Sequence, residues 1–124
     1  MELVLCNPEY CEFVYSLRIN FKESFLTQKY FSLSEHEEFM SKNSQNYYIC
    51  LLDKKPIGFI GTVSGDVRIA VCELYQKKGV GKFMLEKFLE KHPKGHARIK
   101  IDNEKSIKLF ESCGFKKKHY ILEK

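Results

Sequence analysis

The chain has 124 residues, of which 44% are hydrophobic and 30% charged, so it is long enough for one domain (residues 1–124) and too apolar to be disordered. Lys and Arg number 21 against 16 Asp and Glu, a net charge of +5 that favours an anionic partner, either a nucleic acid or a phosphorylated metabolite. The longest strongly apolar run, Tyr47 to Leu52, is far shorter than the ~20 residues of a transmembrane helix, which excludes a membrane-spanning protein.

The first part of the chain predicts one strand and two helices. Residues 2–5 read as a short strand, and residues 8–17 place apolar side chains at the i, i+3, i+4, i+7 spacing of an amphipathic helix. Two overlapping capping boxes, the first of them Ser32 with Glu35, predict a second helix over residues 33–42. The stretch between the helices, residues 18–31, has no clear pattern.

Three strands and a helix are expected next. Residues 47–52 and 56–63 flank a turn and predict a hairpin, and a second turn at residues 64–66 leads into a strand at 67–72. After Gly79 the apolar period changes to 3.6, which predicts a helix ending near Pro93.

The C-terminal part predicts a strand at residues 97–101, a helix at 105–113 and a last strand at 115–122. A strand, a crossover helix and a strand between residues 67 and 101 form a βαβ unit, so we expect its two strands to be parallel neighbours. The predicted sheet is therefore mixed and mostly antiparallel, with one central parallel pair.

The best candidate for a binding site is the segment from Gln76 to Lys82. Ligands of such sheets bind beyond the carboxyl ends of strands where the strand order diverges, and this segment joins a strand end to the most regular helix. It has two glycines where the backbone must turn, three lysines, and the unpaired N–H groups of a helix start. It predicts a phosphate cradle, with an ordinary lysine-rich helix start as the alternative.

Two common phosphate motifs do not fit this segment. A P-loop needs Gly at position 76 and Ser or Thr at position 83, where Gln76 and Phe83 stand. A dinucleotide fingerprint needs Gly at position 84, where Met84 stands. The remaining pattern, Q-x-x-G-x-G after a strand ending in Val71, resembles the acyl-coenzyme A motif of the GCN5-related N-acetyltransferase (GNAT) superfamily.

A second motif supports the resemblance. Residues 103–115, N-E-K-S-I-K-L-F-E-S-C-G-F, are similar to the family's N-x-x-[AS]-I-x-L-Y-x-x-x-G-F helix, and the element order is similar over nearly the whole chain, although the C-terminal part looks one strand short. The resemblance implies an α/β (α+β) GNAT fold with helices on both faces of the sheet. It also implies an acetyl-CoA-dependent N-acetyltransferase that moves an acetyl group to a primary amine by direct attack, without a metal.

The resemblance also implies which residues bind the cofactor. The backbone at Ala70 and Val71 would pair with the pantetheine arm of acetyl-CoA and present an N–H to the thioester carbonyl. Asn103 and Ser106 would border the pantetheine and the adenosine, while Phe110 stands where the family has a tyrosine that protonates the departing thiolate. The pyrophosphate would be held by Gln76, Lys77, Lys78, Gly79, Val80, Gly81 and Lys82.

The general base stays open at this point. The family often has a glutamate on the strand before Val71, but Gly65 stands at that spacing, and Asp66 one residue later would face the other side of a regular strand. Glu73 just past Val71 and His36, by its intrinsic pKa, are the other candidates. The alternative for each is a solvated surface residue.

The acceptor is expected to be a small-molecule amine. Arg18-Ile19-Asn20 and residues 31–39 resemble, over a short stretch, bacterial acetyltransferases of nucleotide-linked amino sugars, which makes Arg18 and Asn20 the candidate substrate residues. Acetylation of a protein or peptide amine is the alternative within enzymes, and a non-catalytic acyl-CoA-binding module is the alternative outside them. A homodimer that completes the sheet is also compatible with the short C-terminus.

The remaining features point away from other classes of protein. The lysines do not interleave with aromatic residues as in a nucleic-acid platform, so no nucleic-acid partner is expected. Five cysteines, an odd number without a C-x-x-C pair, favour neither a disulfide framework nor a zinc site. With no targeting segment in view, we expect a cytoplasmic enzyme without a bound metal.

Overall fold

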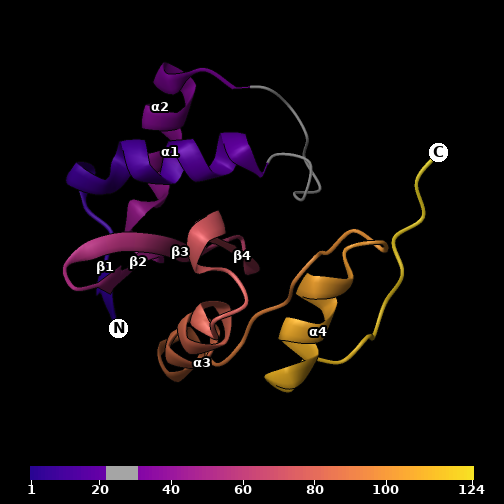
Figure 1. Ribbon diagram of the computed structural model, residues 1–124. Coiled ribbons are helices and arrows are strands. Elements are labelled where there is room, and N and C mark those ends of the chain that lie inside the picture. Colours follow the sequence, from indigo (N-terminus) through magenta and orange to yellow (C-terminus); the bar gives the residue numbers. More distant parts are fainter. Residues whose placement is uncertain (22–30) are drawn as a thin grey trace.

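The structure is a computed structural model that describes residues 1–21 and 31–124. Within these ranges, four strands form one antiparallel sheet in the order β1-β2-β3-β4 (Figure 1). The strands are β1 (Glu2–Leu5), β2 (Tyr47–Leu52), β3 (Lys55–Val63) and β4 (Asp66–Val71). Because β1 joins the free edge of β2, the opposite edge of the sheet belongs to β4.

Tight two-residue turns connect the last three strands. Asp53 and Lys54, between β2 and β3, have φ angles of 50° and 66°, and Ser64 and Gly65, between β3 and β4, have φ angles of 52° and 81°. Two successive positive φ angles are typical of type I′ turns, whose twist matches the right-handed twist of strands. The turns therefore explain why these strands pair with their neighbours in sequence.

Helices α1 (Cys11–Asn20) and α2 (Leu33–Asn43) lie on one side of the sheet (Figure 1). A short 3-10 helix, η1 (Pro8–Tyr10), leads into α1, and Ser32 forms the predicted capping box with Glu35 at the start of α2. The core on this side consists of Cys6, Val14, Leu17, Met40, Tyr47, Ile49, Leu51, Phe59 and Ala70.

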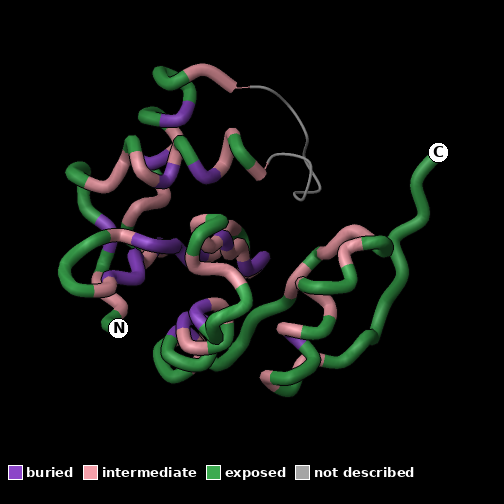
Figure 2. The backbone as a smooth tube through the Cα atoms, in the orientation of Figure 1, coloured by how far each residue is buried: buried purple, intermediate pink, exposed green. Residues whose placement is uncertain are grey.

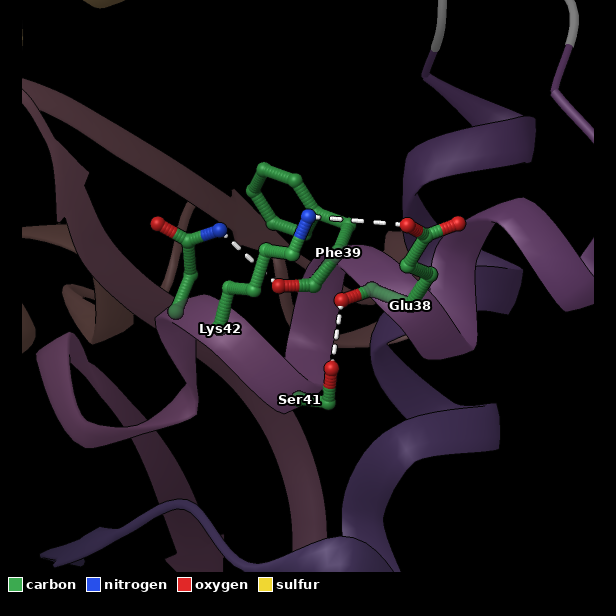
Figure 3. A network of polar contacts seen from close by, with 5 residues as sticks. Glu38, Phe39, Ser41 and Lys42 are labelled. Atoms are coloured by element: carbon green, nitrogen blue, oxygen red, sulfur yellow. Dashed lines mark hydrogen bonds and ion pairs between the residues drawn. The ribbon is translucent and has the colours of Figure 1, made fainter.

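The outer face of α2 satisfies its polar groups within the helix. Lys42 Nζ lies 3.5 Å from Glu38 Oε1, and the Ser41 hydroxyl donates to the Glu38 carbonyl at 2.7 Å (Figure 3). Asn43 Nδ2 donates to the Phe39 carbonyl at 2.9 Å. An exposed i,i+4 ion pair contributes only ~0.3–0.5 kcal/mol to stability. This face of α2 is therefore a solvent-exposed surface, and the buried face of the helix holds it to the sheet.

Helices α3 (Val80–Lys91) and α4 (Glu104–Ser112) lie on the other side, with α4 packed beside α3 (Figure 1). The buried core on this side consists of Cys50, Ile57, Ile60, Val67, Val80, Met84, Leu85, Phe88 and Phe110. Figure 2 shows the buried segments concentrated in the sheet and on the inner sides of the helices. The expected α+β class with helices on both faces is confirmed.

The parallel part of the sheet is smaller than expected. The strand predicted at residues 97–101 is not formed, and the chain after α3 joins β4 at one parallel bridge, Asp66 to His96. There Val67 N donates to His96 O at 2.9 Å, and His96 N donates to Gly65 O at 3.1 Å. In the described residues no second bridge follows this one. The predicted parallel pairing of two strands is therefore limited to a single bridge.

The strand predicted at residues 115–122 is wrong. This segment has no regular secondary structure, and Tyr120 and Leu122 are 88% and 93% exposed. Figure 2 shows it as an exposed tail that leaves the body of the molecule after α4. A strand needs a neighbour with free N–H and C=O groups, and the segment that should have supplied one, residues 97–101, is itself outside the sheet.

None of the helices in the described ranges has the length and apolar content to cross a membrane. The five cysteines are free thiols. Burial raises the pKa of Cys6 to about 11, so this thiol stays protonated near neutral pH. Cys6 and Cys50 therefore serve as small apolar core residues, one on each side of the sheet.

Candidate functional site

The site begins at the outer edge of β4. Val67 N donates outward to His96 O, whereas Cys72 N donates inward to Ile57 O of β3 at 2.8 Å. Because backbone groups alternate between the two sides of a strand with a period of two, the N–H groups of Ile69 and Val71 point outward. In the described residues no strand lies beside this edge. Val71 thus presents its N–H at the open edge, as a thioester oxygen would require.

Ala70, the other backbone residue predicted to bind the cofactor, faces the opposite way. By the same alternation its N–H and carbonyl point toward β3, where the register pairs it with Phe59. A Cβ added to Gly58 would lie 2.9 Å from the Ala70 carbonyl oxygen. Ala70 therefore fixes the strand in the sheet, while its neighbour Val71 faces the edge.

A short turn links the end of β4 to α3. A 3-10 helix, η4 (Glu73–Tyr75), follows the strand, and Gln76 Nε2 then donates back to the Val71 carbonyl at 3.1 Å. Lys77 and Gly79 both have positive φ angles, of 63° and 81°. The turn is therefore held against the last residue of the strand by one side-chain hydrogen bond.

The start of α3 has the geometry of an anion site. Gly79 is the N-cap, Val80 is buried and anchors the first turn, and a Cβ added to Gly79 would meet nothing within 4 Å. The first N–H groups of a helix have no intrahelical partners and carry the positive end of its dipole. Together with the exposed Lys77, Lys78 and Lys82, this open cradle fits a pyrophosphate.

Lys55 is a residue of this region that sequence reasoning missed. Its Nζ lies 6.0 Å from the centre of the Tyr75 ring, and Lys78 Nζ lies 5.9 Å from the same centre. Lys55 comes from the β2–β3 hairpin, so only the pairing of the strands brings it to η4. The local sequence around the turn therefore does not indicate that Lys55 lies there.

Helix α4 borders the cradle through its packing on α3. A Cβ added to Gly81 would lie 3.2 Å from Leu109 Cδ2, so Gly81 allows the two helices to approach closely. Asn103 is the N-cap of α4, and its Oδ1 accepts from the N–H of Ser106, in the first turn, at 3.2 Å. Phe110 is only 4% exposed, and its ring belongs to the core and offers no hydroxyl.

Asp66 lies at the other end of β4 and is engaged in pairing. Its carboxylate accepts from Arg98 N at 3.0 Å and lies 3.7 Å from both Arg68 Nε and Arg98 Nε. These contacts hold the segment after α3 against the start of β4. The structure does not bring Asp66 to Val71.

His36 is completely buried between α2 and α1. Its Nε2 lies 2.8 Å from the Cys11 carbonyl and its Nδ1 lies 2.9 Å from Arg18 Nη1. Since a guanidinium can only donate, Nδ1 accepts and Nε2 carries the proton. Burial, assisted by the charge of Arg18, lowers the pKa of His36, so the ring is neutral and both of its nitrogens are used.

Of the three base candidates, Glu73 lies nearest in sequence to the open end of β4. It is exposed in η4, and its carbonyl accepts from Gln76 N at 3.2 Å. Its backbone is therefore part of the turn that carries the predicted pyrophosphate cradle.

The substrate candidates lie on α1, on the opposite side of the sheet from α3. Asn20 is exposed at the end of the helix, whereas the Arg18 guanidinium lies 4.1 Å from the centre of the Phe31 ring and 4.4 Å from that of Phe39. Burial lowers the pKa of Arg18. The structure does not group Asn20 with Arg18.

Arg68 and Tyr47 join Arg18 on this face, and sequence reasoning missed both. Arg68 Nε lies 3.7 Å from Asp66 Oδ2, and Tyr47 is completely buried, which raises the pKa of its hydroxyl. The sequence did contain a signal for Arg68. It is two residues from Asp66 and two from Ala70, so all three side chains lie on the same face of β4.

A groove of about 400 Å³ lies elsewhere, between η1–α1 and α2. Its lining consists of Asn7, Pro8, Cys11, Glu12, Glu37, Met40, Ser41 and Ser44. No residue of β4 or of the turn before α3 lines it. The groove is therefore separate from the site at the end of β4.

Comparison with known proteins identifies the fold. A ribosomal-protein-alanine N-acetyltransferase from Brucella melitensis superposes with a TM-score of 0.79 at 14% identity, covering 94% of this chain and 85% of that one. A variant of a spermidine N-acetyltransferase from Vibrio cholerae gives 0.80 at 19% identity, covering 99% and 85%. An aminoglycoside N-acetyltransferase, AAC(6')-Iy in complex with CoA, gives 0.76 at 17% identity, covering 99% and 92%.

The sequence itself gives the family. A search of curated protein sequences finds no match. The model of the acetyltransferase (GNAT) family, however, matches residues 11–115, a range that includes the edge of β4, the turn before α3 and the α4 motif. The chain therefore belongs to the GNAT family of acetyltransferases.

Proposed function

We propose that this enzyme transfers the acetyl group of acetyl-CoA to the primary amine of a small molecule by direct attack. Membership of the family supports acetyl transfer. The observation that carries the proposal is the arrangement at the end of β4, where an outward N–H of Val71 and the open turn before α3 follow one another. The N–H of Val71 suits a thioester oxygen, and the turn before α3 suits a pyrophosphate.

The residues at the edge of β4 and in the turn fit the cosubstrate. Backbone N–H groups at the start of α3, with Lys77, Lys78 and Lys82, would hold the pyrophosphate. The backbone of Val71 would pair with the pantetheine arm and donate to the carbonyl oxygen of the thioester, where negative charge develops during attack. Asn103 and Ser106, at the cap of the adjacent α4, would border the coenzyme.

Proton transfer sets the main barrier that side chains can lower. An alkylamine with a pKa of ~10.4 needs roughly 4–5 kcal/mol to lose its proton at pH 7, whereas a thiol with a pKa of ~8.5 leaves as the thiolate at a cost of roughly 2 kcal/mol. A base therefore helps more than an acid, and the missing hydroxyl at Phe110 is tolerable. Glu73 is the carboxylate we propose for this role, since His36 and Asp66 are used in packing contacts.

For the acceptor, a nucleotide-linked amino sugar is the candidate we propose first. Its diphosphate would suit the net charge of +5 and the guanidinium of Arg18, which lies on α1. We place the reaction in the cytoplasm, because all five cysteines are free thiols, as expected in a reducing compartment.

The experiment is a coenzyme A release assay with acetyl-CoA, in which the product masses are read in parallel. The panel holds nucleotide amino sugars, small amines and peptides. A gain of one acetyl group on a small amine supports the proposal, and a gain on a sugar nucleotide supports the specific acceptor. Acetylated peptides alone would instead assign a protein amine as the substrate, and tight coenzyme binding without any product would indicate a non-catalytic module.

A further inference from the structure

The segment after α4 is basic and exposed. Phe115 is its last anchored residue, because its N–H donates to the Phe110 carbonyl at 3.1 Å and the two rings meet edge-to-face with their centres 5.0 Å apart. Every residue from 116 to 124 is exposed, and the segment leaves the body of the molecule (Figure 2). Residues 116–122, K-K-K-H-Y-I-L, are called the basic tail below.

The basic tail combines positive charge with apolar surface. Three successive lysines come first, and Tyr120, Ile121 and Leu122 follow with 88%, 57% and 93% of their surface exposed. An extended chain spans ~3.3 Å per residue, so the tail can reach roughly 20 Å from α4. Contiguous exposed apolar side chains next to charged ones are typical of a surface that another molecule covers.

The groove between η1–α1 and α2 has the opposite charge. Its lining includes the carboxylates of Glu12 and Glu37, and none of the described residues that line it is a lysine, an arginine or a histidine. The groove also lies at the C-terminal end of α2, where the helix dipole is negative. Lys42, at the same end of α2, is exposed and lies 3.5 Å from Glu38 outside the groove. The groove is therefore acidic in a chain of net charge +5.

The walls of the groove suit a lysine side chain. Pro8 and Met40 supply apolar surface, and burial, followed by the charges of Glu37 and Glu12, raises the pKa of the Cys11 thiol between them. Lysine packs its alkyl stem on apolar surface and keeps its ammonium group at a polar rim. The volume of about 400 Å³ also falls within the ~300–1,000 Å³ of clefts that bind ligands.

We propose that the basic tail of one copy of the chain docks in the acidic groove of a second copy, so that the enzyme forms a dimer. The lysines of the tail pair with Glu12 and Glu37, and its apolar end covers the apolar wall of the groove. Reciprocal exchange of two tails closes the assembly with two-fold symmetry. No residue of β4 or of the turn before α3 lines the groove, so this dimer leaves the candidate site open, and the inference does not depend on the proposed function.

The first test measures the oligomeric state of two charge-reversed variants by sedimentation equilibrium. The groove variant carries Glu12→Lys and Glu37→Lys, and the tail variant carries Lys116→Glu, Lys117→Glu and Lys118→Glu. All five positions are exposed, so both variants should fold. We expect a concentration-dependent dimer of the wild type whose Kd rises at least about tenfold in either variant, because like charges then face one another. A wild type that stays monomeric at every concentration would overturn the inference.

Mixing the two variants tests the contact itself. The basic tail of the groove variant then meets the unaltered acidic groove of the tail variant, and the acidic tail of the tail variant meets the reversed, basic groove. Both contacts are restored, so heterodimers should form with nearly the affinity of the wild type. A mixture that stays monomeric would contradict docking between copies, and it is also the result expected if the tail occupied the groove of its own chain.

A control separates the groove from the net charge of the protein. Glu86→Lys with Glu90→Lys makes the same change of charge on the exposed face of α3 and should leave the dimer unchanged. If this control loses the dimer as strongly as the groove variant does, the effect comes from net charge and the inference fails. A wild-type dimer that both charge-reversed variants retain would place the interface elsewhere on the molecule and would equally reject it.

The Cys11 thiol provides a second readout that needs no activity. It lines the groove and is partly exposed, so a docked tail should slow its alkylation by iodoacetamide. The labelling of each cysteine is read by peptide mass spectrometry, with the partly exposed Cys72 as the internal control. We expect Cys11 to react more slowly at concentrations where the dimer forms, while the rate at Cys72 stays constant. A dimer in which Cys11 reacts as fast as in the monomer would contradict the inference.

Discussion

The side-chain amide of Gln76 donates to the backbone carbonyl of Val71 at 3.1 Å, and this contact ties the turn before α3 to the last residue of β4. The carbonyl lies on the outward side of the strand, the same side as the Val71 N–H. One glutamine therefore fixes the position of the predicted pyrophosphate cradle relative to the predicted thioester contact.

Replacing this glutamine tests the contact. Gln76→Ala removes one hydrogen bond, worth ~1 kcal/mol, so we expect the Kd for CoA to rise roughly fivefold, with a smaller change in thermal stability. Calorimetric titration measures the Kd. Gln45→Ala is the matched control, because Gln45 Nε2 also caps a carbonyl, that of Lys42 at 2.8 Å, at a distance from the site. An equal loss of affinity in both variants would contradict the role of Gln76.

The lysines around the turn should act through charge. Substituting Lys77, Lys78 and Lys82 together by Gln should weaken CoA binding at least roughly tenfold at low salt and flatten its salt dependence, because the attraction is screened. The control removes the same number of charges from the far end of α3 and beyond, at Lys87, Lys91 and Lys94. A salt dependence that stays the same in the first variant would place the phosphate elsewhere.

Asp66 should matter for stability. Asp66→Ala leaves Arg68 and Arg98 without their shared carboxylate, and we expect a loss of about 3 kcal/mol in the free energy of unfolding. Asp66→Asn keeps an oxygen acceptor for Arg98 N and should lose less. Urea denaturation gives both values, and Glu38→Gln, which breaks an exposed pair with Lys42, should change stability by less than ~0.5 kcal/mol. A loss in Asp66→Ala as small as this would show that the pairing is weak.

The buried His36 should make the stability of the protein depend on pH. Its pKa in the folded chain is lowered from 6.5 by burial first, with the nearby charge of Arg18 adding to the effect. Below about pH 6.5 His36 therefore binds a proton in the unfolded chain but stays neutral in the folded chain. The free energy of unfolding should fall as the pH drops through this range, by at most ~1.4 kcal/mol per pH unit. Unfolding curves between pH 5 and 8 for the wild type and for His36→Gln measure it. A wild-type slope that His36→Gln leaves unchanged would assign the dependence to other groups.

The elements that the sequence predicts well are those that local patterns determine. The helices at residues 33–43 and 80–91 follow from a capping box and a 3.6-residue period, and strands β2 to β4 follow from alternation and turn residues. The parallel strand at residues 97–101 could not be judged this way. Its apolar and basic residues alternate as they do in strands. A strand forms, however, only when it pairs with the edge of a neighbouring strand, and here the pairing stops at His96.

The candidate site divides in the same manner. The turn from Gln76 to Lys82 is contiguous in sequence, so its glycines and lysines can be recognised together. Lys55 reaches the turn from the β2–β3 hairpin, so its proximity to Tyr75 depends on strand register. His36 has a suitable intrinsic pKa, but only the structure shows that both of its ring nitrogens are occupied.

The open edge of β4 links coenzyme binding to the mobility of backbone amides. The N–H groups of Ile69 and Val71 point away from β3, and the described residues offer them no strand partner. Their hydrogens should exchange with solvent deuterium quickly in the free enzyme, while those of Arg68 and Ala70, which face β3, exchange slowly. Binding of the pantetheine arm would complete the ladder at this edge, so the exchange rate of two amides becomes a direct reading of how much of the enzyme carries its coenzyme.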